Sequence, residues 1–366
     1  MKRTSAEPHI MTYLHQKGRA LGLPIAGTFE LTPRCNFNCP MCYIHMTPEQ
    51  QKQVGTELTA RQWLQLARDA RDAGMLVALL TGGEPLVRND FFEIYSGMKK
   101  LGLMVSVNTN GSMLQGEILE KFLDDPPARF NISLYGGCNE TYEKMCGLPM
   151  YDRVRSNIAA LRKAGIEVSL NLSITPYNSR DLEKIYQDAV DLDVNIKASS
   201  YMYPPVRVQE DSYGEGKRFS PCQSAAASLR WDRLRFTPEE FRKRMENTAA
   251  LAALESDCPT EADSGVRCRA GSTSFWLTWD GKMLPCGMMP HPIAYPLETG
   301  FANAWEAIRT ATAAIRLPSA CNTCPKKPVC PVCAAVCVTE SGAFDQVPHY
   351  LCQQVEETIR LAKEEL

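Results

Sequence analysis

Residues 25–42 read IAGTFELTPRCNFNCPMC, an apolar run followed by three closely spaced cysteines. The run Ile25–Leu31 has the β-rich composition of a strand. Cys35, Cys39 and Cys42 follow it within eight residues. Three thiolates at this spacing can hold one iron–sulfur cluster from a single loop and leave one iron open, whereas a structural zinc site normally has four protein ligands.

Strands and helices alternate from this loop to about residue 200. Further β-rich runs lie at 76–80, 104–108, 130–134, 168–174 and 194–198, and amphipathic helical patterns lie near 57–73, 89–101, 114–124, 152–164 and 179–191. This alternation predicts a parallel sheet. Six units are fewer than the eight of a closed barrel, so the sequence predicts an α/β fold with a partial (β/α)6 barrel.

Glycine and polar residues follow the predicted strands at the end where parallel barrels bind ligands. Thr81-Gly82-Gly83-Glu84-Pro85 ends the second strand, and its glycines permit close backbone approach while its carboxylate can accept from an ammonium group. Asn108-Thr109-Asn110-Gly111 ends the third strand and Ser133 ends the fourth, while Asn171 and Ser173 lie on the fifth.

The CxxxCxxC loop, with Tyr43 after its third cysteine, resembles the hallmark of the radical S-adenosylmethionine (SAM) superfamily, and residues 82–85 look like its GGEP motif. The resemblance implies a [4Fe–4S] cluster whose open iron binds SAM, a radical that abstracts hydrogen, and a reductant such as flavodoxin or ferredoxin. It implies a cofactor site formed by Tyr43, Gly82, Gly83, Glu84, Pro85, Asn108, Asn110, Ser133, Asn171 and Ser173. A satisfied polar residue at a strand end is the alternative for the last three.

Eight of the 15 cysteines form a C-terminal group. They are Cys268, Cys286, Cys321, Cys324, Cys330, Cys333, Cys337 and Cys352. In a reducing cytosol such grouping indicates metal sites rather than disulfides. A predicted hairpin over 274–285, with its turn at Asp280-Gly281, and helices near 301–315 and 350–365 accompany them.

This region resembles the SPASM domain of peptide-modifying radical SAM enzymes, which implies two auxiliary iron–sulfur clusters of the [4Fe–4S] type. The family order gives Cys321, Cys324, Cys330 and Cys352 to one cluster and leaves Cys268, Cys286, Cys333 and Cys337 for the other. The spacing after Cys330 departs from the family, so a rival hypothesis binds only one of Cys333 and Cys337 and leaves an open iron. A zinc ribbon is a further alternative.

The predicted domains are an N-terminal segment 1–24, the partial barrel 25–200, a linker and helix 201–259, and a small cysteine-rich domain 260–366 with the hairpin and helices. Between these clusters, Cys138 and Cys222 are candidate hydrogen donors to a substrate radical, with a buried or incidental thiol as the alternative.

Charge and hydrophobicity limit the partners and the location that we expect. The net charge is -2, so the sequence does not predict nucleic acid as a partner. The first residues lack the apolar core of a signal peptide and no stretch has the length of a membrane span, so we expect a cytoplasmic protein without a membrane partner.

The resemblance implies a peptide or protein substrate, modified by thioether or carbon–carbon crosslinking or by epimerisation. Only 34 residues precede Cys35, so we expect leader binding to require a separate protein or to be unnecessary. A sulfatase-maturing enzyme is an alternative, although such enzymes carry Asp where this chain has Gly287. Modification of a small molecule or cofactor, and a non-catalytic electron carrier, are the others.

If the cysteines hold iron–sulfur clusters, the anaerobically reconstituted protein will absorb at about 400 nm, and dithionite will bleach this band. Zinc-bound thiolates show no such band. A protein that binds zinc stoichiometrically and remains colourless contradicts the prediction.

Overall fold

The computed structural model of the chain describes residues 7–207, 217–253 and 264–366. The chain divides into two compact units, each assembled from separate stretches of sequence. The first unit comprises Met1–Cys35, Met46–Asn108 and Val266–Ile315. The second comprises Asn36–His45, Thr109–Gly265 and Arg316–Leu366. Cys258 lies outside the described residues.

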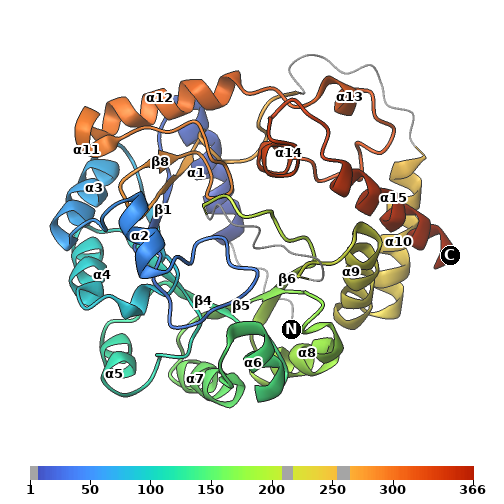
Figure 1. Cartoon of the computed structure of the whole chain (residues 1–366), viewed down its shortest axis with the longest axis horizontal. Coiled ribbons are helices and arrows are strands. Elements are labelled where there is room, and N and C mark those ends of the chain that lie inside the picture. Colours follow the sequence, from blue (N-terminus) through green and yellow to red (C-terminus); the bar gives the residue numbers. More distant parts are fainter. Residues whose placement is uncertain (1–6, 208–216, 254–263) are drawn as a thin grey trace. The chain divides into compact units, whose positions relative to one another are not determined.

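The first unit is built on five strands in the order β3-β2-β1-β7-β8 (Figure 1). The strands are β1 Ala26–Glu30, β2 Val77–Thr81, β3 Met104–Thr109, β7 Ser274–Leu277 and β8 Met283–Leu284. β1 pairs in parallel with β2 on one side and with β7 on the other, so Ala26 has both Val77 and Ser274 as partners. β8 runs antiparallel to β7, which confirms the predicted hairpin.

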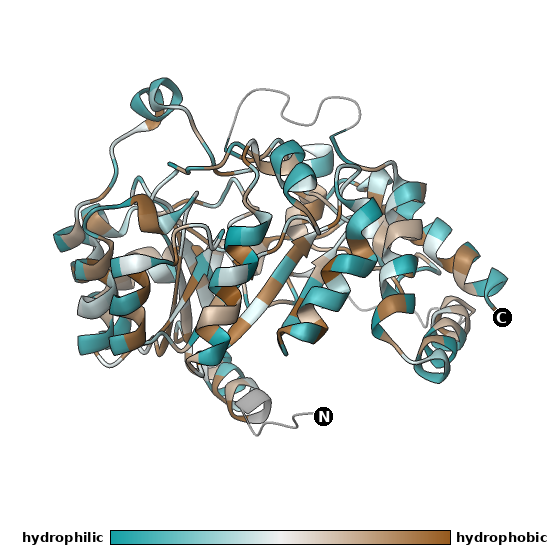
Figure 2. Ribbon diagram, turned by 90° about the horizontal axis from the view of Figure 1, so that it is seen from below, coloured by the Kyte–Doolittle hydropathy of each residue, from teal (hydrophilic) through white to brown (hydrophobic). Residues whose placement is uncertain are grey.

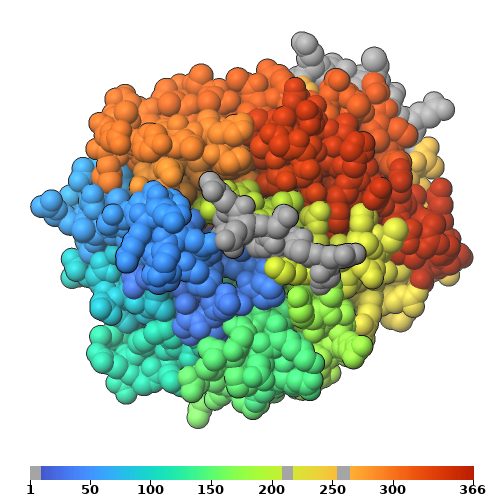
Figure 3. Space-filling view, viewed as in Figure 1, coloured from blue at the N-terminus to red at the C-terminus, as the bar shows by residue number. Residues whose placement is uncertain are grey.

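Helices border this sheet along the first unit. They are α1 Glu7–Leu21, α2 Pro48–Val54, α3 Ala60–Asp72, α4 Phe91–Lys100, α11 Pro296–Thr299 and α12 Phe301–Ala314, with a 3₁₀ turn η1 at Pro85–Val87. α3 begins with a capping box in which Thr59 and Gln62 satisfy each other's backbone N–H groups. α2 buries no residue and lies on the face that Figure 3 shows.

Aromatic side chains fill the core between the sheet and α3. Phe29 on β1 meets Trp63 edge-on at a ring separation of 5.9 Å and Phe275 at 6.0 Å. Gly27 makes room for this packing, because a Cβ there would stand 2.4 Å from the Phe275 ring. α3 buries its apolar side. In Figure 2, hydrophilic and hydrophobic colours both occur along the helices.

The second unit contains three parallel strands in the order β6-β5-β4. They are β4 Arg129–Ser133, β5 Val168–Ser173 and β6 Asn195–Ser199. Its helices are α5 Gly116–Asp124, α6 Asn139–Cys146, α7 Tyr151–Lys163, α8 Leu182–Asp191, α9 Pro221–Arg235, α10 Pro238–Ala252, α13 Ser319–Asn322, α14 Ala334–Ser341 and α15 His349–Glu364, with a 3₁₀ turn η2 at Ser179–Asp181.

The predicted α/β fold with parallel strands is confirmed, and the strand pairings of the described residues close no barrel. The structure adds β7, a further parallel strand from the C-terminal hairpin, to the six predicted ones. It also shows α9, in a part of the predicted linker and helix segment 201–259 to which the sequence analysis assigned no element. The α9 signal was the capping box of Ser220 and Gln223 around Pro221.

In the part of the chain that the structure describes, no helix combines the length and apolar character that crossing a bilayer requires. The predicted domain boundaries at 200 and 260 stay a prediction. Val266–Ile315, however, belongs to the same compact unit as β1.

Two leucines of the first unit provide a matched test of the core. Leu66 on α3 is fully buried, whereas Leu76 is 42% exposed. We expect Leu66→Ala to lower the free energy of unfolding by about 2–5 kcal/mol, because it leaves a cavity, and Leu76→Ala to lower it by less than about 1 kcal/mol. Denaturant titration of both variants measures this. Equal losses would contradict the packing described here.

Candidate active site

The three cysteines of the CxxxCxxC motif lie on one partly exposed loop that follows β1. The Cys42 N–H donates to the Cys39 carbonyl at 3.1 Å, which tightens the loop. The His45 N–H donates to Cys42 Sγ at 3.2 Å. A backbone donor of this kind favours the thiolate form in which a cysteine binds iron.

The glycines of residues 82–85 lie against the backbone that leads into this loop. The Gly83 N–H donates to the Thr32 carbonyl at 2.8 Å, and the Glu84 N–H donates to the Arg34 carbonyl at 2.9 Å. A Cβ on Gly83 would stand 2.3 Å from the Arg34 oxygen, and one on Gly82 would stand 2.6 Å from the Thr32 oxygen. The glycines therefore permit close approach to the start of the cysteine loop.

Glu84 and Pro85 continue this segment into η1. The Glu84 side chain is fully buried and accepts from the Leu86 N–H at 3.1 Å, which fixes the turn. Pro85 is the first residue of η1, where its missing N–H costs no hydrogen bond. The motif thus forms a rigid turn at the end of β2.

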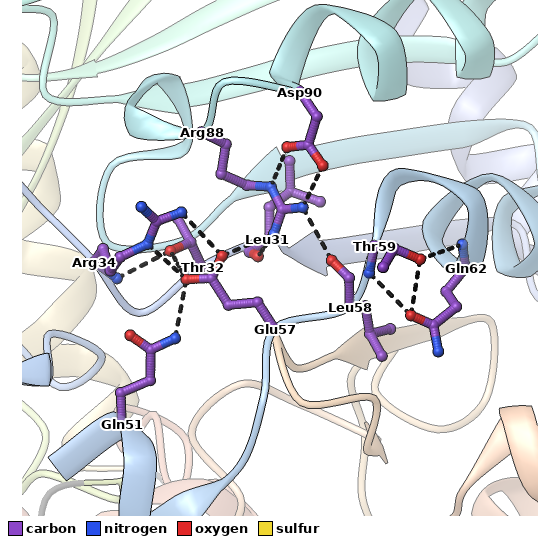
Figure 4. Close-up of polar contacts among 10 residues, drawn as sticks. All are labelled: Leu31, Thr32, Arg34, Gln51, Glu57, Leu58, Thr59, Gln62, Arg88 and Asp90. Carbon is purple, nitrogen blue, oxygen red and sulfur yellow. Dashed lines mark hydrogen bonds and ion pairs between the residues drawn. The ribbon is translucent and has the colours of Figure 1, made fainter. Parts of the chain in front are cut away.

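A network of charged side chains joins the same backbone to neighbouring loops (Figure 4). Arg34 binds Glu57 through two bonds, Nε to Oε1 at 2.8 Å and a terminal nitrogen to Oε2 at 3.0 Å. Thr32 donates its hydroxyl to the same carboxylate at 2.6 Å. The nearly buried Arg88 pairs with Glu57 at 3.0 Å and with Asp90 at 2.7 Å.

Arg88 also donates to two main-chain carbonyls, those of Leu31 at 2.8 Å and Leu58 at 2.9 Å. Burial alone would raise the pKa of Glu57, but the bonds from Arg34 and Thr32 and the charges of Arg34 and Arg88 lower it below its ordinary value. We name this set the Glu57 clamp. It consists of Thr32, Arg34, Glu57, Arg88 and Asp90. The sequence analysis missed it.

A second set of hydrogen bonds holds the loop residue Asn36 within the second unit. Asn36 donates to the Ser112 hydroxyl at 2.9 Å, and Asn110 donates to the Asn36 side-chain oxygen at 2.9 Å. Ser112 in turn donates to Asn110 Oδ1 at 2.7 Å. Asn110 and Ser112 are buried, so Asn110 contacts the cysteine loop directly. Asn108 is half-buried at the end of β3.

Tyr135 lies beside the cysteine loop, and the sequence analysis missed this role. Burial raises the pKa of its hydroxyl, the charges of Cys39 and Cys146 raise it further, and a hydrogen bond with Ser133 opposes them. The neighbouring Cys146 thiol and partial shielding from water hold the pKa of Cys39 well above its ordinary value. Ser133, predicted at the end of β4, is therefore linked to the cysteine loop indirectly, by its hydrogen bond with Tyr135.

The remaining predicted residues lie in the second unit. Asn171 on β5 is the register partner of Ser133 on β4, and the Ser173 carbonyl accepts from Asn178 at 2.9 Å. Cys138 is exposed at the N-cap of α6, with Sγ 3.4 Å from the Thr141 hydroxyl. Cys222 is exposed in the first turn of α9. No contact of Cys222 with the loop cysteines is recorded among the described residues.

Tyr43, which follows the third cysteine, is partly buried. The guanidinium of Arg207 lies over its ring, 5.8 Å from the centroid. This cation–π contact fixes the aromatic ring that borders the loop.

Two C-terminal cysteines line a cavity of about 680 Å³ in the first unit. Cys268 is exposed and Cys286 is partly exposed, and Trp276 and Gly287 also line the wall. Trp276 donates its ring N–H to buried Glu30 at 2.7 Å. A Cβ on Gly287 would stand 2.8 Å from the Trp276 ring, so an aspartate there requires this ring to move.

The other six cysteines of the C-terminal group gather in the second unit. Burial raises the pKa of Cys330 to about 11, with Cys352, Cys321 and Cys324 as charged neighbours that raise it further. Burial likewise raises the pKa of Cys337 to about 12, beside Cys321, Cys333 and Cys330. Because one thiolate affects the pKa of another only at short distance, these thiols lie near one another.

Within residues 7–207, 217–253 and 264–366, no three His, Cys, Asp or Glu side chains converge tightly enough to hold a single metal ion. The thiolates of an iron–sulfur cluster each bind a different iron atom. Their sulfur atoms therefore lie further apart than the ligand atoms of a single metal ion. The Tyr203 hydroxyl lies 3.9 Å from Cys333 Sγ, at the border of the thiol group.

Comparison with known proteins agrees with the geometry of the cysteine loop and the glycine turn. The family model described as the radical SAM superfamily matches residues 29–189. This stretch of the chain is similar to radical SAM domains. It contains the CxxxCxxC loop, the GGEP turn, the end of β1 and the whole of β2–β5. The family implies a [4Fe–4S] cluster and SAM as cofactors.

Curated relatives extend the similarity beyond this domain. The AdoMet-dependent heme synthase of Methanosarcina barkeri is 27% identical over 335 residues, which cover 86% of this chain and 93% of the relative. The PqqA peptide cyclase of Streptomyces rochei is 25% identical over 322 residues, which cover 84% and 83%. Streptococcus suis SuiB bound to its precursor peptide SuiA shares the fold, with a TM-score of 0.69 and 16% identity over 95% of this chain and 80% of that one.

The Glu57 clamp makes a specific prediction. Glu57→Gln removes the charge that Arg34 and Arg88 share, so we expect a loss of about 1–3 kcal/mol in unfolding free energy and a lower iron content after reconstitution. Glu117→Gln is the matched control, because the Glu117 side chain is 79% exposed and pairs only across one helical turn. Denaturation and iron analysis measure both effects. Full iron loading and unchanged stability in Glu57→Gln would show that the clamp does not hold the loop.

Proposed function

We propose that this chain is an enzyme that binds a [4Fe–4S] cluster through Cys35, Cys39 and Cys42, binds SAM beside it, and modifies a peptide. The observation that carries this proposal is the attachment of the cysteine loop to the GGEP turn. Three soft thiol ligands on one loop fit an iron–sulfur cluster. When bound, cluster and SAM together supply the radical chemistry that removes a hydrogen atom from the substrate.

The protein's own residues orient the loop. Backbone donors such as the His45 N–H support the thiolates, and the Glu57 clamp fixes the loop at its N-terminal side. The proposed SAM contacts are Tyr43, Gly82, Gly83, Glu84, Pro85, Asn108, Asn110, Ser133, Asn171 and Ser173. For Asn110 we also propose a positioning role, because its side chain donates a hydrogen bond to Asn36 in the cysteine loop. Cys138 and Cys222 remain the proposed hydrogen donors, and both are exposed.

Two auxiliary clusters complete the proposal. Cys321, Cys324, Cys330 and Cys352 influence one another and form the proposed ligand set of the first. Cys268 and Cys286, which line one cavity, are proposed to bind the second together with Cys333 and Cys337. The raised thiol pKa values mean that these cysteines release protons when metal binds. A flavodoxin or ferredoxin is the proposed reductant.

A peptide substrate is supported by the PqqA peptide cyclase, to which this chain is similar over most of its length. Small-molecule modification is the second candidate, because the AdoMet-dependent heme synthase is similar over a comparable length. A sulfatase-maturing activity is less favoured, since the Trp276 ring occupies the space that an aspartate at position 287 needs. The candidate peptide outcomes are a thioether or carbon–carbon crosslink, or an epimerised residue.

Anaerobic incubation of the reconstituted full chain with SAM and dithionite tests the proposal. We expect 5′-deoxyadenosine to form and the amount to fall to background in Cys42→Ala. Chromatography with mass spectrometry then compares an added cysteine- or aromatic-rich peptide with an added iron tetrapyrrole. Mass change of the peptide supports the proposal, and change of the tetrapyrrole alone supports the second candidate. Absence of 5′-deoxyadenosine with every substrate contradicts both.

A further inference from the structure

The three strands of the second unit present two faces of opposite character. β6, β5 and β4 lie side by side in that order (Figure 1). Register partners on neighbouring parallel strands share a face. One face carries the pairs Phe130–Val168 and Ile132–Leu170, whose members are at most 1% exposed. α7 contacts β5 and α8 contacts β6, so this apolar face is the one that the helices cover.

The opposite face is polar at every position. Its side chains come from alternate residues of the three strands, and they are Asn131, Ser133, Ser169, Asn171, Ser173, Asn195, Lys197 and Ser199. They comprise amides and hydroxyls with a single cation and no carboxylate. Parallel strands are normally apolar on both faces, because both are covered by other parts of the protein. A face without any apolar side chain therefore fits a polar ligand better than packing.

Lys197 is the cation of this polar face, and its side chain is exposed. It is the register partner of Asn171, which is in turn the register partner of Ser133. These three residues form one row across β6, β5 and β4, with about 5 Å between neighbouring strands. Within the part of the chain that the structure describes, Lys197 forms no ion pair. An ammonium group beside amides and hydroxyls provides the donors that bind a carboxylate.

The place of Lys197 favours a carboxylate of the substrate over that of SAM. Hydrogen bonds tie the cysteine loop to residues that follow β3 and to the end of α6, which follows β4. Lys197 lies on β6, the second strand beyond β4. In the proposed function Ser133 and Asn171 contact SAM, so Lys197 comes next in the same row. An anion bound there belongs to a molecule that lies beside SAM.

We infer that Lys197 binds an acidic side chain of the peptide substrate on the polar face of β4–β6, and so selects peptides that carry Asp or Glu near the modified residue. Lys197 is then a specificity-determining residue. This inference rests on the proposed function, because it requires a peptide that binds beside SAM.

Peptides in matched pairs test this selection. The reconstituted full chain is mixed anaerobically with SAM, without reductant, and with a pool of short cysteine- and aromatic-rich peptides whose ends are acetylated and amidated. The two members of each pair differ only by Glu or Gln at one position. Gel filtration separates the retained peptides, and mass spectrometry gives the ratio of the acidic to the amide member.

The wild type is compared with three variants, Lys197→Gln, Lys197→Arg and Lys163→Gln. Lys163→Gln is the matched control, because Lys163 is an exposed lysine at the end of α7, a helix that contacts β5. We expect the wild type to retain the acidic members about three- to tenfold more than the amide members, as one charge-assisted contact near the surface allows. Added salt should lower this preference.

Lys197→Gln should bring the ratio close to one, whereas Lys197→Arg should keep most of the preference because it keeps the charge. Lys163→Gln should match the wild type. An equal affinity of all four proteins for SAM, measured by equilibrium binding, should accompany these results.

A wild type without acidic preference, or one that retains no peptide, would overturn the inference. An unchanged ratio in Lys197→Gln would also overturn it and leave Lys197 a residue that only keeps the edge strand β6 from pairing with another chain. Weaker SAM binding in this variant, with an unchanged peptide ratio, would assign the contact to SAM instead. The measurement involves no SAM cleavage, so absence of 5′-deoxyadenosine is a failure of the proposed function alone.

Discussion

The structure of the candidate site depends on one close approach between two backbones. The segment Thr32–Arg34, after β1, accepts hydrogen bonds from Gly83 and Glu84, after β2, and lies too close to Gly82 and Gly83 to leave room for a side chain. Because β1 and β2 are parallel and in register, their carboxyl ends lie side by side. A side chain at position 83 would occupy the space of the Arg34 carbonyl. The glycine pair is therefore what allows the cysteine loop to begin where it does.

The Glu57 clamp reinforces this approach within the first unit, and the hydrogen bonds of Asn36 hold the next part of the loop within the second unit. One acts before Cys35 and the other immediately after it. The loop is thus fixed at both sides of its first cysteine while the thiols remain partly exposed. In the proposed function, such an arrangement would keep the cluster ligands in place and leave room for SAM.

The sequence revealed those parts of the fold and site that short patterns determine. Alternating strands and helices, the hairpin at Asp280-Gly281 and the two cysteine groups are local signals. The Glu57 clamp was not predictable in the same way, because its charges come from separate loops with no fixed spacing. Cys146 looked like a scattered thiol, and only the packing of α6 brings its carbonyl to the Asn38 N–H of the cysteine loop.

The pairing of β7 with β1 could not be predicted from the sequence either. The hairpin was predicted from its turn, but its parallel partner lies far away in the sequence, and no local pattern specifies such a partner. Side-chain fit at Gly27 and Phe275 selects this pairing, because the glycine leaves the space that the aromatic ring fills.

The same pairing has a consequence for the order of events during synthesis. When the CxxxCxxC loop leaves the ribosome, the edge of β1 that β7 will cover is still bare, since residues 274–277 are made much later. An uncovered strand edge can form hydrogen bonds with a wrong strand or with another chain. The nascent protein thus carries the CxxxCxxC loop beside an unfinished sheet until the C-terminal hairpin has been made.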